Sequence, residues 1–132
     1  MPNSESSPFG PLIYAYTRQQ ALADGVLIDF SDLAREAGFR YPLAVTERLY
    51  HDYIVPSFDL ASDGQSIEGR AWDLLQVLRY AVSSSPDISE LSFSVLFLMT
   101  VGHDPVPIKL KAACHPGDDG EPVLTVTLPD ED

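Results

Sequence analysis

The feature that most constrains this sequence is a change in hydrophobic period two-thirds of the way along the chain. After the turn residues 83–87, apolar side chains recur at every second position in three successive runs, 91–99, 106–114 and 124–128. Period two is the spacing of a β-strand with one buried face. Turn-forming residues separate the runs, and short turns join antiparallel neighbours. The pattern therefore predicts a three-stranded antiparallel sheet.

The first of these runs is apolar on both faces in its second half. Leu96 precedes Phe97 and Leu98 follows it, at the alternate positions that Ser92 and Ser94 occupy in the earlier part of the run. Strands that are buried on both faces have this composition. We therefore expect residues 91–99 to form a central strand.

Before the turn, residues 67–82 follow the 3.6-residue period of an amphipathic α-helix. One stripe of this helix is apolar, formed by Ile67, Ala71, Leu74, Leu75, Leu78 and Val82. The predicted sheet supplies the surface that would bury this stripe. We expect the middle of the stripe, Leu74, Leu75 and Leu78, to pack against Phe93, Val95, Ile108, Leu110 and Val126.

The N-terminal half carries shorter signals. The sequence predicts an extended segment at 26–30 and helices at 18–23, 32–37 and 46–54. Thr17 and Gln20 form a capping box before the first helix, and Ser31 suits the N-cap of the second. Pro56 follows the third helix and cannot continue it.

Together these signals predict an α+β fold, with N-terminal short helices and one long amphipathic helix packed on the C-terminal three-stranded antiparallel sheet. The length of 132 residues is that of one ordinary domain. Residues 1–11 contain prolines and serines without periodicity, which is typical of a flexible lead-in. We therefore predict a single α+β domain over residues 12–132.

The chain is strongly acidic, with 20 Asp and Glu residues against 8 Lys and Arg residues and a formal net charge of -12. This charge disfavours direct binding to nucleic acid or to an anionic membrane. Apolar runs are far shorter than the roughly 20 residues of a membrane-spanning helix. The N-terminus lacks the basic and apolar regions of a secretory signal. With a single cysteine, Cys114, these features predict a cytoplasmic protein.

The sequence has no recognisable catalytic, cofactor-binding or metal-binding motif, and we expect no such residues. His103 and His115 fall at opposite ends of one predicted strand, too far apart to share a metal ion. Cys114 alternates with Leu110 and Ala112 on one face of that strand. This position predicts a buried, unreactive thiol.

Other polar residues also have a simple structural interpretation. His51 and Asp52 are neighbours on a predicted helix, so their side chains point in different directions, and we place the histidine on the surface. The basic residues of the N-terminal half stand among acids. We interpret them as local charge pairs rather than a basic patch: Arg18, Arg35, Arg40 and Arg48.

One part of the sequence resembles a known family. Residues 13–29 read IYAYTRQQALADGVLID, residues 34–39 read AREAGF, and residues 42–46 read PLAVT. This opening resembles that of an uncharacterised family of small bacterial proteins carried on conjugative elements, plasmids and phages. The resemblance implies a mobile-element setting, without an activity or catalytic residues. Small acidic proteins from such elements include inhibitors of restriction and CRISPR complexes that occupy DNA-binding surfaces.

These observations favour a non-enzymatic accessory protein of a mobile element that binds a host protein through an acidic surface, as counter-defence inhibitors of the anti-CRISPR or antirestriction type do. The partner would be a nucleic-acid-binding defence complex. The turn before the last predicted strand and the tail after it supply the candidate partner-binding residues, which could bracket one edge of the sheet: Asp118, Asp119, Glu121, Asp130, Glu131 and Asp132. Two other classes stay open, an enzyme with dispersed catalytic residues and a self-associating accessory or regulatory subunit.

Overall fold

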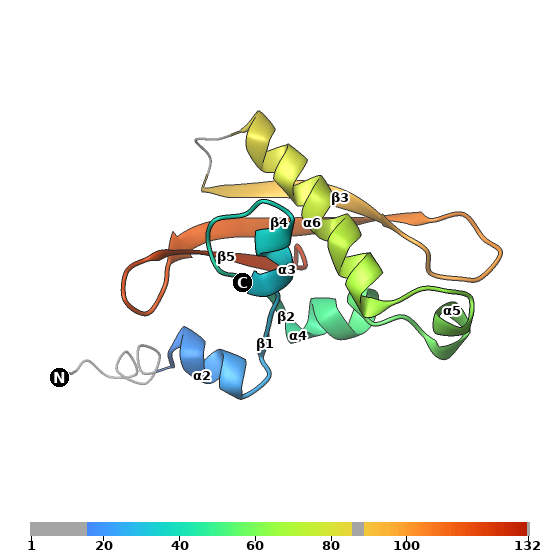
Figure 1. Cartoon of the computed structure of the whole chain (residues 1–132), viewed down its shortest axis with the longest axis horizontal. Coiled ribbons are helices and arrows are strands. Elements are labelled where there is room, and N and C mark those ends of the chain that lie inside the picture. The colour runs from blue at the N-terminus through green and yellow to red at the C-terminus, as the bar shows by residue number, and fades with distance from the viewer. Residues whose placement is uncertain (1–15, 86–88, 132) are drawn as a thin grey trace.

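A five-stranded mixed sheet is the central feature of the computed structural model, which describes residues 16–85 and 89–131 (Figure 1). The strands lie in the order β1-β2-β5-β4-β3. β2 and β5 run parallel, whereas the other neighbouring strands are antiparallel. Their bounds are Leu27–Asp29 for β1, Leu43–Thr46 for β2, Glu90–Phe97 for β3, Val106–Pro116 for β4 and Pro122–Thr127 for β5.

Helices connect β1 to β2 and β2 to β3, and α6 crosses one face of the sheet (Figure 1). Their bounds are Arg18–Ala23 for α2, Ser31–Glu36 for α3, Glu47–Leu49 for α4, Phe58–Ser62 for α5 and Ile67–Ser84 for α6, with a π-helix, η1, at Tyr50–Ile54. α2 differs from the others, because its Arg18 reaches Thr125, which points away from the core side of β5. The predicted lead-in at 1–11 lies outside the described residues.

The predicted packing of the long helix on the sheet is confirmed. Leu74, Leu75 and Leu78 of α6 are at most 1% exposed. They belong to one core cluster with the predicted strand residues Phe93, Val95, Leu110 and Val126, against which Ile108 is partly buried. The ends of the predicted stripe are less buried, and Ile67 is 37% exposed. The core therefore centres on the middle of α6.

The prediction of three strands is wrong, because two further strands complete the sheet. β3, β4 and β5 do form the predicted antiparallel series. β2 then adds to β5 in parallel, and β1 closes the far side as an antiparallel neighbour of β2. The two added strands are three and four residues long. Segments this short do not reveal a period of two.

The prediction of a central strand at 91–99 is also wrong, because β3 is an edge strand. Leu96 points away from the core and is 62% exposed, and Leu98 lies beyond the end of the strand at Phe97. The central strand is β5. Apolar residues on both faces of β3 therefore reflect an exposed leucine rather than a second packed layer.

The N-terminal helices follow the sequence signals in part. The capping box is confirmed, with Gln20 N–H donating to Thr17 Oγ1 at 3.0 Å and Thr17 N–H donating to Gln20 Oε1 at 2.8 Å. Ser31 is not a side-chain cap; it begins α3, and its Oγ accepts the Leu43 N–H of β2 at 3.0 Å. The helix predicted from 46 begins at Glu47 as α4 and widens into η1.

α6 also buries a charge, Arg70, which is 3% exposed. Its guanidinium donates to the carbonyls of Tyr53 and Leu98 at 2.9 and 2.7 Å and to Gln65 Oε1 at 3.0 Å. It lies 5.0 Å from the centre of the Phe97 ring. Arg70 therefore joins η1, the segment before α6 and the end of β3, and the inward face of α6 is not purely apolar.

Within residues 16–85 and 89–131, none of the helices combines the length and hydropathy that crossing a membrane requires.

Candidate functional site

Two of the three acidic residues predicted in the β4–β5 turn, Asp118 and Glu121, bind their own chain, whereas the Asp119 carboxylate has no hydrogen bond or ion pair among the described residues. Asp118 accepts the backbone N–H groups of Arg18 and Gln19 at 2.8 and 3.0 Å, at the start of α2. These backbone hydrogen bonds hold the pKa of Asp118 below its ordinary value. Glu121 Oε1 accepts the backbone N–H of Asp119 at 3.0 Å. Much of this turn's negative charge thus supports α2 and the turn itself.

The predicted acids of the tail are engaged in the same way. Asp130 pairs with Arg48 at 2.9 Å, and this hydrogen bond holds the pKa of Asp130 below its ordinary value. Glu131 Oε1 accepts the Thr46 hydroxyl at 2.7 Å and the Leu128 N–H at 2.8 Å. Asp132 lies outside the described residues. The turn and the tail flank opposite ends of β5, but β5 is the central strand, so they do not bracket a sheet edge.

A second acidic surface lies between α3 and the start of α6, and we name it the α3–α6 groove. Its volume is about 400 Å³, and its lining combines four carboxylates with three apolar side chains: Asp29, Phe30, Asp32, Leu33, Glu36, Ile67 and Glu68. Two of these carboxylates are engaged within the chain: Asp32 pairs with the exposed Arg35 at 3.1 Å, and Asp29 accepts the Ser31 N–H at 3.0 Å. Among the described residues, Glu36 and Glu68 have no ion pair or side-chain hydrogen bond. This groove therefore presents acidic charge beside accessible apolar surface.

The opposite face of the sheet carries a polar groove beneath α2, of about 540 Å³. Arg18 donates to Thr125 Oγ1 at 2.8 Å, and His115 Nε2 lies 2.8 Å from the same oxygen. His115 Nδ1 lies 3.1 Å from the Pro116 carbonyl. The Pro116 carbonyl can only accept a hydrogen bond, whereas the Thr125 hydroxyl can donate to the ring or accept from it. The Oγ1 of Thr127, on the same strand, is buried and has no partner among the described residues.

This hydroxyl–imidazole pair has the separation of a nucleophile and its base. Two features oppose that role. The imidazole is oriented by a carbonyl rather than a carboxylate, and Thr125 Oγ1 already accepts from Arg18. Lys111 of β4 also lines the groove, with Nζ 3.8 Å from Glu90 and 3.1 Å from the Glu131 carbonyl. The groove thus mixes charges of both signs that are largely satisfied internally.

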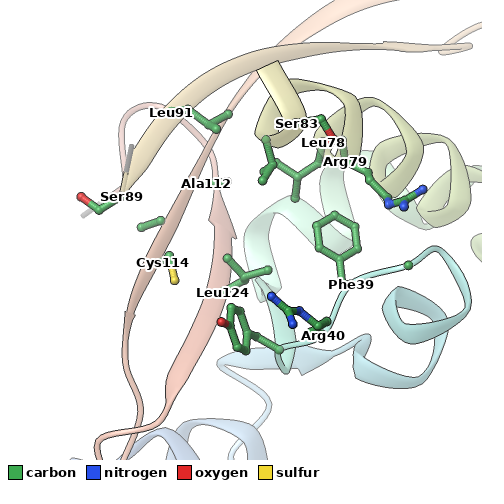
Figure 2. A pocket seen from close by; sticks show the side chains of 14 residues that line it. Phe39, Arg40, Leu78, Arg79, Ser83, Ser89, Leu91, Ala112, Cys114 and Leu124 are labelled. Atoms are coloured by element: carbon green, nitrogen blue, oxygen red, sulfur yellow. The ribbon is translucent and has the colours of Figure 1, made fainter. Parts of the chain in front are cut away.

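Cys114 lies on the core side of β4 as predicted, but it is half-buried rather than buried. Its thiol faces a cavity of about 390 Å³ between the C-terminal half of α6 and the sheet (Figure 2). Phe39, which follows α3, forms part of the opposite wall. The thiol is half-exposed toward this space, which no side chain of a described residue fills. We name it the Cys114 cavity.

The remaining predicted residues are scattered. His51 is exposed on η1 and packs edge-on against Tyr50 at 5.1 Å. Two of the predicted arginine charge pairs are present, Arg35 with Asp32 and Arg48 with Asp130. Arg18 and Arg40 form no ion pair within the described part of the chain; the Arg18 guanidinium instead donates to Thr125 Oγ1 and to the Leu124 carbonyl. In the same part of the chain, no group of three or more His, Cys, Asp and Glu residues could hold a metal ion.

Comparison with known proteins identifies a family. No curated protein and no solved structure matched the chain. A family model described as "Family of unknown function (DUF6573)" matches residues 9–132. The match agrees with the resemblance to an uncharacterised family and does not bear on a mobile-element setting. Because it spans nearly the whole chain, the protein belongs to the DUF6573 family of unknown function.

Proposed function

We propose that this protein is a non-enzymatic accessory protein of a mobile element that binds a basic surface of a host protein. The α3–α6 groove is the observation that carries the proposal. It places four carboxylates around Phe30, Leu33 and Ile67. Basic surfaces of nucleic-acid-binding proteins offer the complementary charge, and a counter-defence inhibitor of the anti-CRISPR or antirestriction type would occupy such a surface.

The groove suits this role better than the turn and tail acids do. Asp118, Asp130 and Glu131 already accept hydrogen bonds from the chain itself. A carboxylate that already accepts hydrogen bonds within the chain is stabilised less by binding a partner. Glu36 and Glu68 face solvent without such contacts in the described residues, so their charge is available. The apolar side chains between them can add burial to electrostatic attraction.

The net charge of -12 also supports binding to a basic surface. A strongly negative field accelerates encounter with a basic partner, and its effect weakens as salt screens it. The mobile-element setting rests on the resemblance of the opening residues alone. A cytoplasmic location follows from the proposed partner.

The experiment begins with capture of partners from a host lysate at low and high salt, followed by kinetics with the purified partner. Glu36→Gln with Glu68→Gln removes two charges from the groove. Asp104→Asn with Asp119→Asn removes two exposed charges from hairpin loops and is the matched control. We expect the groove variant to slow association by about tenfold at low salt and the control by less than about twofold.

Equal slowing of association by both variants would mean that only net charge matters, and would contradict the proposal that the α3–α6 groove is the binding surface. An association rate that is unaffected by the groove variant and by salt would contradict the proposal that the protein binds its partner through an acidic surface. Turnover of a substrate by the purified protein would instead favour the enzyme class. In that case Thr125→Val should abolish the activity, since the Thr125–His115 pair in the polar groove beneath α2 has the spacing of a nucleophile and its base.

A further inference from the structure

The Cys114 cavity differs from the rest of this acidic molecule. Its floor is apolar and includes Leu78 of α6, Leu91 of β3 and Leu124 of β5. Its volume of about 390 Å³ falls within the range of small-molecule sites. The cavity therefore offers apolar surface that a ligand could cover.

Among the described residues, the charged side chains that line the cavity are both positive. Arg40 and Arg79 belong to the lining, and none of its described residues is Asp or Glu. The chain has 20 acidic residues and only 8 Lys and Arg residues, so two arginines without an acid among the described lining residues are unexpected. Both are exposed, and neither forms an ion pair or a side-chain hydrogen bond with any described residue. Figure 2 shows Arg40 beside Leu124 and Arg79 beyond Phe39.

The backbone at Gly38 makes room for one of these arginines. A Cβ atom at this position would lie 2.6 Å from Cζ of Arg79, and the φ angle of +106° also favours glycine. The Arg79 guanidinium thus lies directly against the backbone that follows α3. This position of the guanidinium requires a residue without a side chain at 38.

We propose that the Cys114 cavity binds a small amphipathic carboxylate, with its apolar chain on the leucine floor and its carboxylate attracted by the positive charges of Arg40 and Arg79. Guanidinium groups bind carboxylates through paired, charge-assisted hydrogen bonds. An inorganic anion would leave the floor unused, and a neutral ligand would leave the arginines unused. The proposal is independent of the α3–α6 groove, which shares no lining residue with this cavity.

The single cysteine provides the readout, because a ligand in the cavity would cover its thiol. The experiment measures the rate at which a neutral maleimide labels Cys114 in the full chain, with increasing octanoate. Octylammonium has the same chain and the opposite charge, and acetate has the same head without the chain. We expect octanoate to protect the thiol at concentrations about tenfold lower than octylammonium, and acetate to give no protection.

The double substitution Arg40→Gln with Arg79→Gln removes both charges from exposed positions, so the fold should persist. It should weaken protection by octanoate about tenfold and leave the unprotected labelling rate unchanged. Arg35→Gln is the control, since Arg35 is an exposed arginine outside the lining and should leave protection intact. Equal protection by octanoate and octylammonium, no protection by octanoate, or an unaltered response of the double variant would each overturn the proposal.

Discussion

At the scale of single residues, Arg70 is a buried cation whose hydrogen-bond partners are neutral groups. Burial lowers its pKa, and the charge of Asp73 opposes that effect. Arg70→Met would keep much of the volume and leave the Tyr53 and Leu98 carbonyls without their donor. We expect a loss of at least about 2 kcal/mol in the free energy of unfolding, measured with urea. Arg35→Met makes the same change at an exposed site and should alter stability by less than about 0.5 kcal/mol. Equal effects of the two substitutions would refute this role.

Residue roles were the hardest to predict from the sequence, since they depend on partners that are distant in the chain. Asp118 accepts hydrogen bonds from the start of α2, and Asp130 pairs with Arg48, only once the sheet has brought these distant segments together. Charge counts place these acids on the surface, which is correct, but they do not reveal that the carboxylates are already engaged. The Arg79 side chain likewise lies against the Gly38 backbone only because α3 packs beside α6.

At the scale of one element, α2 is a six-residue helix supported at its start by Asp118. The pKa of Asp118 is lowered, so its contribution to stability is complete above the ordinary Asp range and is lost as the pH falls through the lowered pKa. Asp118→Asn should therefore lower Tm at neutral pH, and its difference from the unsubstituted protein should shrink from about pH 5 downward. Asp104→Asn controls for net charge. A difference in Tm that does not change with pH would exclude this account.

Elements were predictable where the signal was local. The capping box of Thr17 and Gln20, and the alternation in β4 and β5, belong to the segments themselves. β1 and β2 are too short to show a period, and all of β2 except Thr46 is buried. η1 has the rare i→i+5 hydrogen bonding of a π-helix, as between the Val55 N–H and the Tyr50 carbonyl at 2.9 Å, and its sequence carries no signal for this geometry.

For the molecule as a whole, stability depends on the contact between α6 and the sheet. Leu75→Asp would place an unpaired charge in this layer, and we expect a loss of several kcal/mol, measured as a lower Tm. Gln76→Asp introduces the same charge at the next position, which is exposed, and should change Tm little. If both variants melt alike, the packing described for α6 is incorrect.

The parallel pairing of β2 with β5 has a consequence for how the protein assembles. The two strands come from opposite halves of the chain, and such non-local pairings form late in folding. Until β2 docks, the free edge of β5 exposes unpaired backbone groups beside Val123, Leu124 and Val126, all of which are buried in the finished sheet. A free apolar edge accepts whichever matching strand arrives first. At high concentration during refolding, that strand can be the β2 of a second molecule, so strand exchange between copies is the misassembly that this topology invites.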